Sequence, residues 1–472
     1  MKKFILSVDQ GTTSTRAILF DHSGQLCYSA QREVTCLFPH PGWVEADALA
    51  IWISVIDVIN ELLIKANISF NDIDSIGITN QRETTVIWDK QTGMPVYNAI
   101  VWQSRQTTAI CDMYADKKEY IHEKTGLLIN PYFSMSKIRF ILDHIPNGQD
   151  RASKGELMFG TIDTWIIYKM TQGKVHATDV SNASRTLLFN IHSLKWDEDL
   201  LKLFNIPKAI LPNVLPSSYN YGKATHFDKN LSICGVAGDQ QAALFGQTCF
   251  EVGESKNTYG TGCFMLMNTG DKVCYALEGS VFVGGATVQW LRDQVGMIKE
   301  SRDSETYAYR CEDSGGVYVV PAFVGLGTPY WDDQARGAIF GLTRGSTKYQ
   351  IVRASLEGIA YQCKDVFEVM KKETKMTLKC LKVDGGATAN NYLMQFQSDI
   401  LQTTILLPKC LETTSLGAAY LAGLNSGFFS SIEEVKKIHC YQNTYLPMMK
   451  KEEVNRRYEG WKTAIKATRV FK

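Results

Sequence analysis

The chain opens on short apolar runs separated by polar turns. The runs Phe4–Val8 and Ala17–Phe20 are rich in β-branched and aromatic residues, so both are predicted to be strands. The polar stretch Asp9–Arg16 lies between them and is predicted to be the turn of a hairpin. A third strand around Leu26–Val34 is expected to extend this hairpin.

A long helix and further strands are predicted next. Ala48–Ala66 carries apolar residues at helical spacing. Ile73–Thr79 and Val86–Asp89 are short apolar runs typical of strands, and Ala99–Trp102 follows them. This mixture predicts an α/β fold, in which ligands bind at the ends of the strands.

Polar residues cluster where one of these strands ends. The run Asn80–Thr85 directly follows the strand Ile73–Thr79. Arg82, Glu83 and Trp102 are therefore expected to line one cleft. The alternative from the residues alone is a surface salt bridge beside a core tryptophan.

Strand-to-helix junctions recur in the middle of the chain. Tyr132–Lys137 opens a helix that runs to His144, and Phe159–Trp165 is a second junction. In the third, a buried strand, a glycine and Asp239 lie at the mouth of a helix. Asp239 is either the N-cap of that helix or a catalytic carboxylate.

The opening pattern returns in the second half. Ser255–Tyr259, the turn Gly260–Gly262 and Cys263–Met267 again form a strand, a Gly/Thr turn and a strand. Gly385 and Gly386 later precede a helix, which is a favourable place for the sugar or phosphate of a nucleotide. The repetition predicts a duplicated domain, with phosphates clamped between its halves.

Composition excludes several classes of protein. The 472 residues are 45% hydrophobic and 21% charged, with a net charge of +1, which is ordinary for a globular protein and argues against a role at nucleic acid or a membrane surface. The twelve cysteines form no C-x-x-C pair, which favours reduced thiols in a cytoplasmic protein over disulfides or a metal site. No apolar run approaches transmembrane length. The length predicts two domains.

The stretch Asp9–Arg16 has the chemistry of a phosphate-binding turn. Gly11 lets the backbone approach a ligand closely, and the hydroxyl residues and Arg16 add hydrogen-bond donors. Asp9 would repel phosphate unless a divalent cation lies between them, which suggests Mg²⁺. No Gly-Lys-Ser/Thr follows, so this is not a Walker A loop. An ordinary polar turn is the alternative.

Taken together, these segments resemble the actin, Hsp70 and sugar-kinase superfamily. The resemblance is closer to the carbohydrate kinases named for an FGGY motif. Gly337–Leu342, followed by Gln350 and Ala354–Glu357, fits one signature of that family, and Tyr132–Ile138 fits the other except that Phe140 replaces a tryptophan.

Four segments resemble the family members that phosphorylate glycerol. They are Asn80–Thr85, Gly160–Asp163, Gly238–Gln241 and Asn257–Gly262. The resemblance implies two actin-like (ribonuclease H-like) α/β domains, 1–248 and 249–472, with the active site in the cleft between them. It also implies ATP and Mg²⁺ as cofactors, glycerol as substrate and a homo-oligomer, dimer or tetramer.

The resemblance further implies a set of site residues. Glycerol would be bound by Arg82, Glu83, Trp102, Tyr132, Asp239, Gln240 and Phe264. Phosphates would be held by Thr12, Thr13, Ser14 and Arg16. The rest of the nucleotide would be held by Thr261, Gly285, Gln289, Gly386 and Asn390. Asp9 would hold the metal through water.

The chemistry of the residues agrees with this assignment. A triol offers only hydroxyl groups, so its pocket needs paired donors and acceptors, which Arg82, Glu83 and Asp239 supply. An alcohol is a poor nucleophile, and Asp239 is expected to accept its proton as general base. Closure of the two domains would exclude water.

Two departures from the family pattern keep alternatives open. Asn268–Val273 passes almost directly into Cys274–Gly279, where family members carry a further strand and turn, so an element of the second sheet is expected to be lost. The loop Tyr221–Asp228 lacks the glycine-rich, arginine-bearing stretch that binds fructose 1,6-bisphosphate in some members. The alternatives are a kinase for another small polyol or sugar and a catalytically weak nucleotide-binding protein.

Overall fold

The fold comes from a computed structural model, in which residues 2–270 and 275–471 are described. The chain divides into two compact units. Unit 1 comprises Met1–Gly246 and Thr414–Ile438, and unit 2 comprises Gln247–Thr413 and His439–Lys472. The family resemblance implied a second domain of residues 249–472, whereas the structure assigns Thr414–Ile438 to unit 1.

Unit 1 is built on a five-stranded sheet with the strand order β14-β6-β1-β2-β3. Strands β1, β6 and β14 run parallel, whereas β2 and β3 follow β1 in antiparallel fashion. The strands of this sheet are β1 (Phe4–Gln10), β2 (Ser14–Phe20), β3 (Leu26–Glu33), β6 (Ile73–Asn80) and β14 (Ser232–Gly238). The predicted three-stranded opening is therefore confirmed.

The first hairpin turn is tighter than the sequence suggested. Only Gly11–Thr13 separate β1 from β2, and Arg16 lies on β2 directly opposite Asp9. The correction has a simple cause. The sequence pattern assigns the polar residues at the adjoining strand ends to the turn because they are not apolar. In the structure their backbones pair as part of the two strands.

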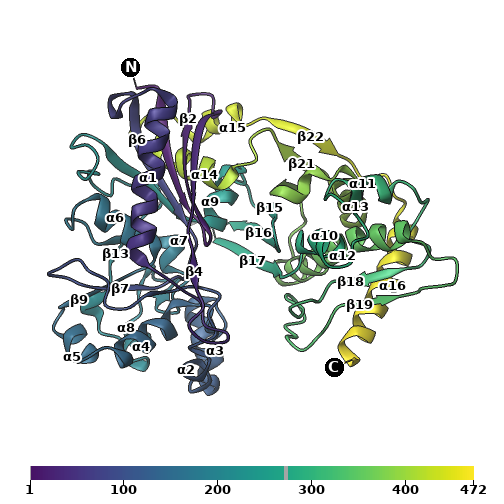
Figure 1. Cartoon of the computed structure of the whole chain (residues 1–472), viewed down its shortest axis with the longest axis horizontal. Helices are drawn as coiled ribbons and strands as arrows, with labels where there is room; N and C mark the ends of the chain where they lie inside the picture. The colour runs from purple at the N-terminus through teal and green to yellow at the C-terminus, as the bar shows by residue number, and fades with distance from the viewer. Residues whose placement is uncertain (1, 271–274, 472) are drawn as a thin grey trace. The chain divides into compact units, whose positions relative to one another are not determined.

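Helices cover this sheet and form a second core in the same unit. The apolar faces of α1 and α6 pack with the sheet strands, while α4 and α8 contribute to a separate cluster lower in Figure 1. The helices of unit 1 are α1 (Ala48–Ala66), α2 (Thr108–Asp112), α3 (Lys118–Thr125), α4 (Ser134–His144), α5 (Gly148–Ser153), α6 (Ile162–Met170), α7 (Val180–Ala183), α8 (Glu198–Leu203), α9 (Asp239–Gly246), α14 (Thr413–Ser426) and α15 (Ile432–Ile438). Its short strands are β4 (Cys36–Leu37), β5 (Glu45–Ala46), β7 (Val86–Asp89), β8 (Ala99–Ile100), β9 (Leu157–Gly160), β10 (Ala177–Asp179), β11 (Phe189–Asn190), β12 (Lys195–Trp196) and β13 (Asn213–Leu215).

Helix α14 lies unusually close to the backbone of unit 1. A Cβ atom added at Gly77 on β6 would lie 2.2 Å from the carbonyl oxygen of Ala418. One added at Gly417 would lie 1.8 Å from the carbonyl oxygen of Ala242 on α9. Glycine is required at both positions because backbone packs directly on backbone there.

Unit 2 repeats the same strand order. Its sheet runs β17-β16-β15-β20-β21-β22, with β15, β20 and β21 parallel and with β16 and β17 antiparallel after β15. The strands are β15 (Glu254–Tyr259), β16 (Cys263–Gly270), β17 (Tyr275–Val281), β20 (Cys380–Asp384), β21 (Ile405–Pro408) and the additional edge strand β22 (Tyr441–Tyr445). The duplicated α/β domain predicted from the two Gly/Thr hairpins is thus confirmed.

The shortened segment leaves this repeat intact. β17 pairs with β16 from Cys263 opposite Val281 to Gly270 opposite Tyr275, so a third antiparallel strand is present. The strand and turn expected to be missing relative to other family members stay a prediction, because this pairing describes only the strands that the chain has. Val273, after which the shortening was expected, lies outside the described residues.

The remaining elements of unit 2 cover its sheet. The helix α12 contributes many buried side chains to the core, and α16 packs against it through Trp461. These elements are α10 (Ala286–Asp293), α11 (Asp303–Ala308), β18 (Tyr318–Val320), β19 (Ala338–Phe340), α12 (Lys348–Thr374), α13 (Asn391–Leu401) and α16 (Lys451–Val470). In the part of the chain that the structure describes, no helix is long and apolar enough to cross a membrane.

Candidate active site

Three parallel strands of unit 1 end at one edge of its sheet. Gln10 on β1 and Gly238 on β14 both lie opposite Asn80 on β6. The residues that follow these strands, among them Arg82 and Asp239, are brought to the same edge although they are far apart in sequence. In open α/β sheets this edge is where ligands bind.

Arg82 and Asp239 form an ion pair at this edge. Arg82 Nε lies 3.1 Å from Asp239 Oδ1, and Arg82 Nη1 donates to Gln241 Oε1 at 3.3 Å. The Arg82 side chain is 2% exposed and that of Asp239 is 33% exposed. A buried guanidinium thus supports a carboxylate that still reaches the surface of unit 1. Because Arg82 is buried, the alternative of a surface salt bridge is wrong.

The turn before Asp239 is fixed by its neighbours. The backbone N–H of Gly238 donates to Ser181 Oγ at 2.8 Å. A Cβ atom at Gly238 would lie 2.7 Å from Arg82 Cγ and Cδ, so a side chain there would displace Arg82. Asp239 is the first residue of α9, and its Oδ1 also accepts from the N–H of Gln240 at 2.7 Å. The carboxylate therefore contacts both the start of the helix and Arg82.

A hydrogen-bond network of buried polar residues lies next to this turn. The Asp179 carboxylate caps α7 by accepting from the N–H groups of Ser181 and Asn182. The amides of Asn182 and Asn80 exchange two hydrogen bonds, of 3.0 and 3.1 Å. Burial raises the pKa of Asp163 to about 7, helped by the nearby charge of Asp179. Such a satisfied network holds one geometry of the strand ends.

Glu83 has an unusual backbone and a cationic partner. Its φ angle is +63°, in the left-handed region that non-glycine residues rarely adopt. Arg185 Nε donates to Glu83 Oε1 at 2.5 Å, and Ser134 Oγ donates to the Glu83 carbonyl at 3.0 Å. Glu83 is only 1% exposed, so its charge is buried beside that of Arg185. Strained backbones of this kind cluster at ligand-binding sites.

Two aromatic residues lie near Arg185, the cationic partner of Glu83. The rings of Trp102 and Tyr132 meet edge to face with centroids 5.3 Å apart, and the Arg185 guanidinium lies 5.5 Å from the Tyr132 ring centroid. Lys137 is buried and donates to the carbonyls of Pro131, Tyr132 and Phe133, which fixes the loop that carries Tyr132. Burial lowers the pKa of Lys137 to about 7, against the opposing effect of Glu83.

The first hairpin turn lies next to these groups. Trp102 donates its indole N–H to Thr12 Oγ1 at 2.8 Å, and Gly11 N–H closes the turn on the carbonyl of Ser14 at 2.8 Å. Thr13 is exposed, whereas Arg16 Nε donates to Gln31 Oε1 on the neighbouring strand β3. The structure thus brings Thr12 together with Trp102 and Tyr132.

Unit 2 gathers a second group of the predicted residues. Gly284 N–H donates to the Thr261 carbonyl at 2.7 Å, and Gly285 N–H to the Gly260 carbonyl at 2.8 Å. A Cβ atom at Gly285 would lie 3.9 Å from Ala387 Cβ, so the turn Gly260–Gly262, the start of α10 and the segment after Gly385 are adjacent. Gln289 is exposed on α10, and Phe264 is half-buried on β16.

The structure assigns a structural role to Asn390. Its Oδ1 accepts from Leu393 N–H as the N-cap of α13, and its Nδ2 donates to Ser304 Oγ at 3.1 Å. Both ends of the side-chain amide are therefore engaged within unit 2. Gly386 lies just before it, and a Cβ atom there would meet no atom within 4 Å, which leaves open space beside the predicted nucleotide residues.

Sequence reasoning missed the supporting residues Ser181, Arg185 and Ser304. Arg185 is 102 positions from Glu83, and Ser304 is 86 positions from Asn390. No local pattern marks such partners, since each contact exists only in the folded chain. That the groups in unit 1 and unit 2 face one another across a cleft stays a prediction.

No group of three or more His, Cys, Asp or Glu side chains that could enclose a metal is found within residues 2–270 and 275–471. This is compatible with Mg²⁺, which is usually bound by one or two carboxylates together with substrate phosphates. Asp9 is half-buried at the end of β1, and its Oδ2 accepts from Ser415 Oγ at 3.3 Å. A hard oxygen ligand is thus present beside the first turn.

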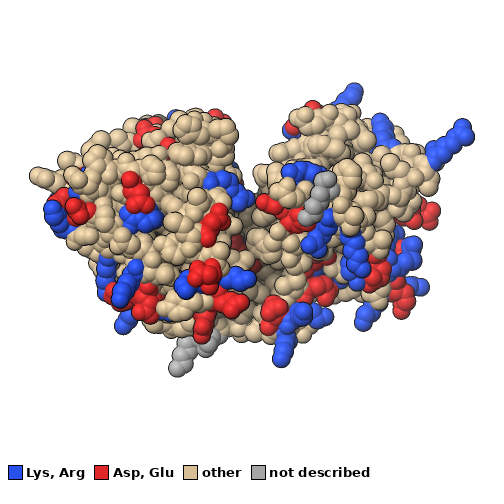
Figure 2. All heavy atoms as spheres, turned by 90° about the horizontal axis from the view of Figure 1, so that it is seen from below, with Lys and Arg blue, Asp and Glu red and all other residues tan. Residues whose placement is uncertain are grey.

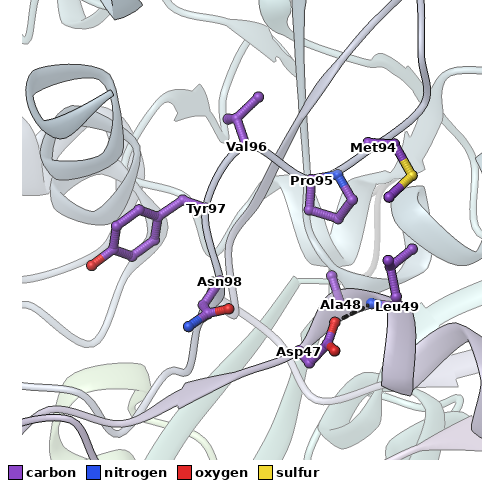
Figure 3. A pocket seen from close by; sticks show the side chains of 8 residues that line it. All are labelled: Asp47, Ala48, Leu49, Met94, Pro95, Val96, Tyr97 and Asn98. Carbon is purple, nitrogen blue, oxygen red and sulfur yellow. Dashed lines mark hydrogen bonds between the residues drawn. The ribbon is translucent and has the colours of Figure 1, made fainter. Parts of the chain in front are cut away.

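A shallow surface pocket lies elsewhere in unit 1. It is lined by Asp47–Leu49 at the start of α1 and by Met94–Asn98, with Met94 and Pro95 opposite Leu49 (Figure 3). None of the predicted site residues lines it, and Asp47 caps α1 by accepting from Leu49 N–H at 2.8 Å. Figure 2 shows acidic and basic side chains interspersed over the visible face, without a block of one sign.

Comparison with known proteins agrees with this arrangement. The profile of the "FGGY family of carbohydrate kinases, N-terminal domain" matches residues 4–246, and that of the C-terminal domain matches residues 255–426. The glycerol kinases of Bacillus licheniformis and Bacillus subtilis are 55% and 54% identical to this chain over 496 aligned positions, with full coverage of both proteins. The alignment is longer than the 472 residues of this chain, so it contains positions that the chain lacks.

Solved structures give the same result. A crystal structure of Plasmodium falciparum glycerol kinase with ADP matches with a TM-score of 0.93 and 36% identity, over 98% of both chains. A gluconate kinase from Lactobacillus acidophilus matches with a TM-score of 0.87 at 22% identity, which shows the shared fold. The two-domain α/β fold, with polar residues at the carboxyl ends of its parallel strands, is that of the carbohydrate kinases. The chain belongs to the FGGY family of carbohydrate kinases.

Proposed function

We propose that this chain transfers the γ-phosphoryl group of ATP to a terminal hydroxyl of glycerol, giving sn-glycerol 3-phosphate and ADP. The observation that carries the proposal is the Arg82–Asp239 ion pair at the carboxyl edge of the unit 1 sheet. The curated relatives at 54–55% identity are named glycerol kinase, which supports glycerol as the substrate. The reaction would serve glycerol uptake and catabolism in the cytoplasm, in a homo-oligomer of two or four chains.

Asp239 acts as the general base in this proposal. The attacking hydroxyl oxygen forms a bond to the γ-phosphorus while the bond from that phosphorus to the β,γ-bridging oxygen breaks, and ADP leaves with the electron pair. The hydroxyl proton passes to the Asp239 carboxylate. Arg82, buried beneath it, holds the carboxylate in place by the 3.1 Å contact between Nε and Oδ1.

Glycerol is bound by the polar and aromatic groups around this carboxylate. Arg82 donates to hydroxyl oxygens, and Glu83 accepts from hydroxyl groups. Trp102 and Tyr132, whose rings are in contact, form an apolar wall for the carbon atoms. Gln240 and Phe264 complete the proposed set. A site that pairs its buried polar groups with substrate hydroxyls discriminates strongly against analogues that lack them.

The two glycine-containing turns hold the nucleotide. The phosphates are assigned to residues of the first hairpin: Thr12, Thr13, Ser14 and Arg16. The remainder of ATP is assigned to residues of unit 2: Thr261, Gly285, Gln289, Gly386 and Asn390. Asp9 would hold Mg²⁺ through water, and the metal would supply charge neutralisation to the phosphates of ATP when bound. Since the Asn390 amide is engaged by α13 and Ser304, we assign its contribution to the backbone.

The test is a coupled assay on the purified protein. ADP release is measured with ATP, Mg²⁺ and glycerol, and the product is identified by NAD⁺-dependent oxidation with a glycerol 3-phosphate dehydrogenase. Xylulose and gluconate serve as competing substrates. The expected result is ADP release that depends on glycerol and matches the glycerol 3-phosphate formed. Absence of glycerol-dependent turnover in folded protein, or faster turnover of a sugar, would overturn the proposal.

A further inference from the structure

Arg185 forms an ion pair with the Glu83 carboxylate, although it lies outside the residues assigned to either substrate. Its Nε lies 2.5 Å from Glu83 Oε1, whereas Arg82 Nε lies 3.8 Å from the same oxygen. The side chains of Glu83 and Arg185 are 2% and 11% exposed. A carboxylate buried to this degree needs a charged partner, and Arg185 supplies it.

The Arg185 side chain is itself held on the aromatic part of the site. Its guanidinium carbon lies 5.5 Å from the ring centroid of Tyr132 and 5.0 Å from that of Phe133. Contact with two rings restricts a long side chain that would otherwise sample many rotamers. The same cation thus contacts the Glu83 carboxylate and the Tyr132 ring, both of which are assigned to glycerol.

The main chain and the carboxylate of Glu83 are held by different contacts. A φ angle of +63° costs free energy for a non-glycine residue and persists only where the surroundings enforce it. Ser134 Oγ fixes the main chain by donating to the Glu83 carbonyl at 3.0 Å. The carboxylate, several bonds further out, is fixed by Arg185. Charged groups that face it include Arg82, Arg185 and, at longer range, Lys137.

We propose that Arg185 is a positioning residue for glycerol recognition. It holds the Glu83 carboxylate and the Tyr132 ring in the one arrangement that accepts the substrate hydroxyls. It acts through Glu83 and Tyr132 and touches neither the nucleotide nor the reacting atoms. The inference rests on the proposed glycerol kinase activity and assigns Arg185 to substrate affinity rather than to the chemical step.

The experiment compares Arg185→Gln and Arg185→Lys with the wild-type protein. Arg185→Gln removes the charge, whereas Arg185→Lys keeps the charge but loses the planar fork and its stacking. Arg185→Gln should raise the KM for glycerol by about tenfold or more, with the KM for ATP changed less than about threefold. Arg185→Lys should recover part of the glycerol affinity, which a merely structural defect would not predict.

A matched control comes from unit 2. Arg353 Nε lies 3.0 Å from buried Glu357, the two side chains are 12% and 1% exposed, and the guanidinium lies over the Tyr392 ring at 4.9 Å. Arg353→Gln therefore removes the same kind of buried ion pair and ring contact. It should lower the melting temperature without raising the KM for glycerol.

A double-mutant cycle with Glu83→Gln separates the two links of the inference. If Arg185 acts through Glu83, Arg185→Gln should cause less than about a threefold further loss of glycerol affinity in the Glu83→Gln background. Additive losses would overturn this, as would a wild-type KM for glycerol in Arg185→Gln. Glycerol binding by calorimetry gives the same comparison for variants with low turnover. A wild-type protein that does not turn over glycerol refutes the proposed function instead, before any variant is made.

Discussion

Trp102 donates its indole N–H to the hydroxyl oxygen of Thr12 at 2.8 Å. This bond joins a residue proposed to bind glycerol to one proposed to bind phosphate, both within unit 1. The acceptor hydroxyl must then direct its own hydrogen elsewhere, because the indole can only donate. The contact therefore leaves the Thr12 hydroxyl hydrogen to another acceptor, which we propose is a phosphate of ATP.

Trp102→Phe keeps an aromatic ring and removes this donor. We expect kcat/KM for ATP to fall about fivefold, the value of one hydrogen bond of about 1 kcal/mol. The KM for glycerol should rise more in Trp102→Ala, which also removes the wall. Trp196→Phe is the matched control, because its indole donates to the Pro212 carbonyl at the same 2.8 Å, away from the assigned residues. Equal effects of the two Phe variants would contradict the assigned role of Thr12.

Asp239→Asn should separate binding from chemistry. The amide keeps the size of the side chain but cannot take up the hydroxyl proton, so kcat should fall by about 100-fold or more while glycerol still binds. Turnover is measured by ADP release and binding by calorimetry. Asp47→Asn, at the exposed N-cap of α1, controls for the loss of one carboxylate. A near-normal kcat in Asp239→Asn would mean that the base lies elsewhere.

The adjacent glycines after β20 should respond differently to alanine. Gly385 has a φ angle of +92°, and a Cβ atom there would lie 2.5 Å from the Tyr259 carbonyl, so Gly385→Ala should destabilise the protein by about 2 kcal/mol or more. Gly386→Ala meets open space and should change stability by less than about 0.5 kcal/mol. If ATP occupies that space, Gly386→Ala should raise the KM for ATP about fivefold or more. Unchanged ATP kinetics would move the nucleotide away from Gly386.

Asp365 on α12 should make stability depend on pH. Its carboxylate accepts from Tyr458 Oη at 2.6 Å and from Trp461 Nε1 at 2.8 Å, yet burial raises its pKa to about 6. The native carboxyl therefore holds its proton at a higher pH than the unfolded one, whose pKa lies near 4. Its contribution to the free energy of unfolding is complete below about pH 4 and is lost as the pH rises through about 6.

Asp365→Asn isolates this contribution. The variant should lack the part of the pH dependence that belongs to Asp365, up to about 2 kcal/mol between pH 4 and 7. Urea unfolding across that range measures it, because other buried carboxyl groups, such as Asp163, remain in both proteins and cancel in the difference. Parallel stability curves for the two proteins would show that Asp365 does not titrate in this window.

Local sequence patterns predicted the elements whose apolar residues follow the spacing of a helix or a strand. The helix α1 spans Ala48–Ala66 and the strand β7 spans Val86–Asp89, as their sequences indicate. The end of β1 was missed because Asp9 and Gln10 are polar, although the backbone there pairs with both β2 and β6. Hydrogen bonding to neighbours extends a strand beyond its apolar residues, and a single-sequence pattern does not contain those neighbours.

The residues of the site also divide into those that the sequence predicts and those that it does not. Residues that follow strand ends, such as Arg82 and Asp239, could be predicted because parallel strands bring their carboxyl ends to one edge. Their roles as ligands of glycerol came from the family resemblance and stay predictions. Arg185 and Ser181 could not be predicted, since each is defined by a contact with a residue far away in sequence.

The assignment of Thr414–Ile438 to unit 1 bears on how the protein is made. Gly77 and Gly417 show that α14 seats directly on the backbone of β6 and α9, so this segment is an integral part of the unit 1 core. During synthesis, residues 1–246 emerge long before it. Their core stays incomplete, because the surface on which α14 packs is uncovered until residues 247–413 have also left the ribosome. The late segment Thr414–Ile438 thus sets the time at which the first half of the chain can finish folding.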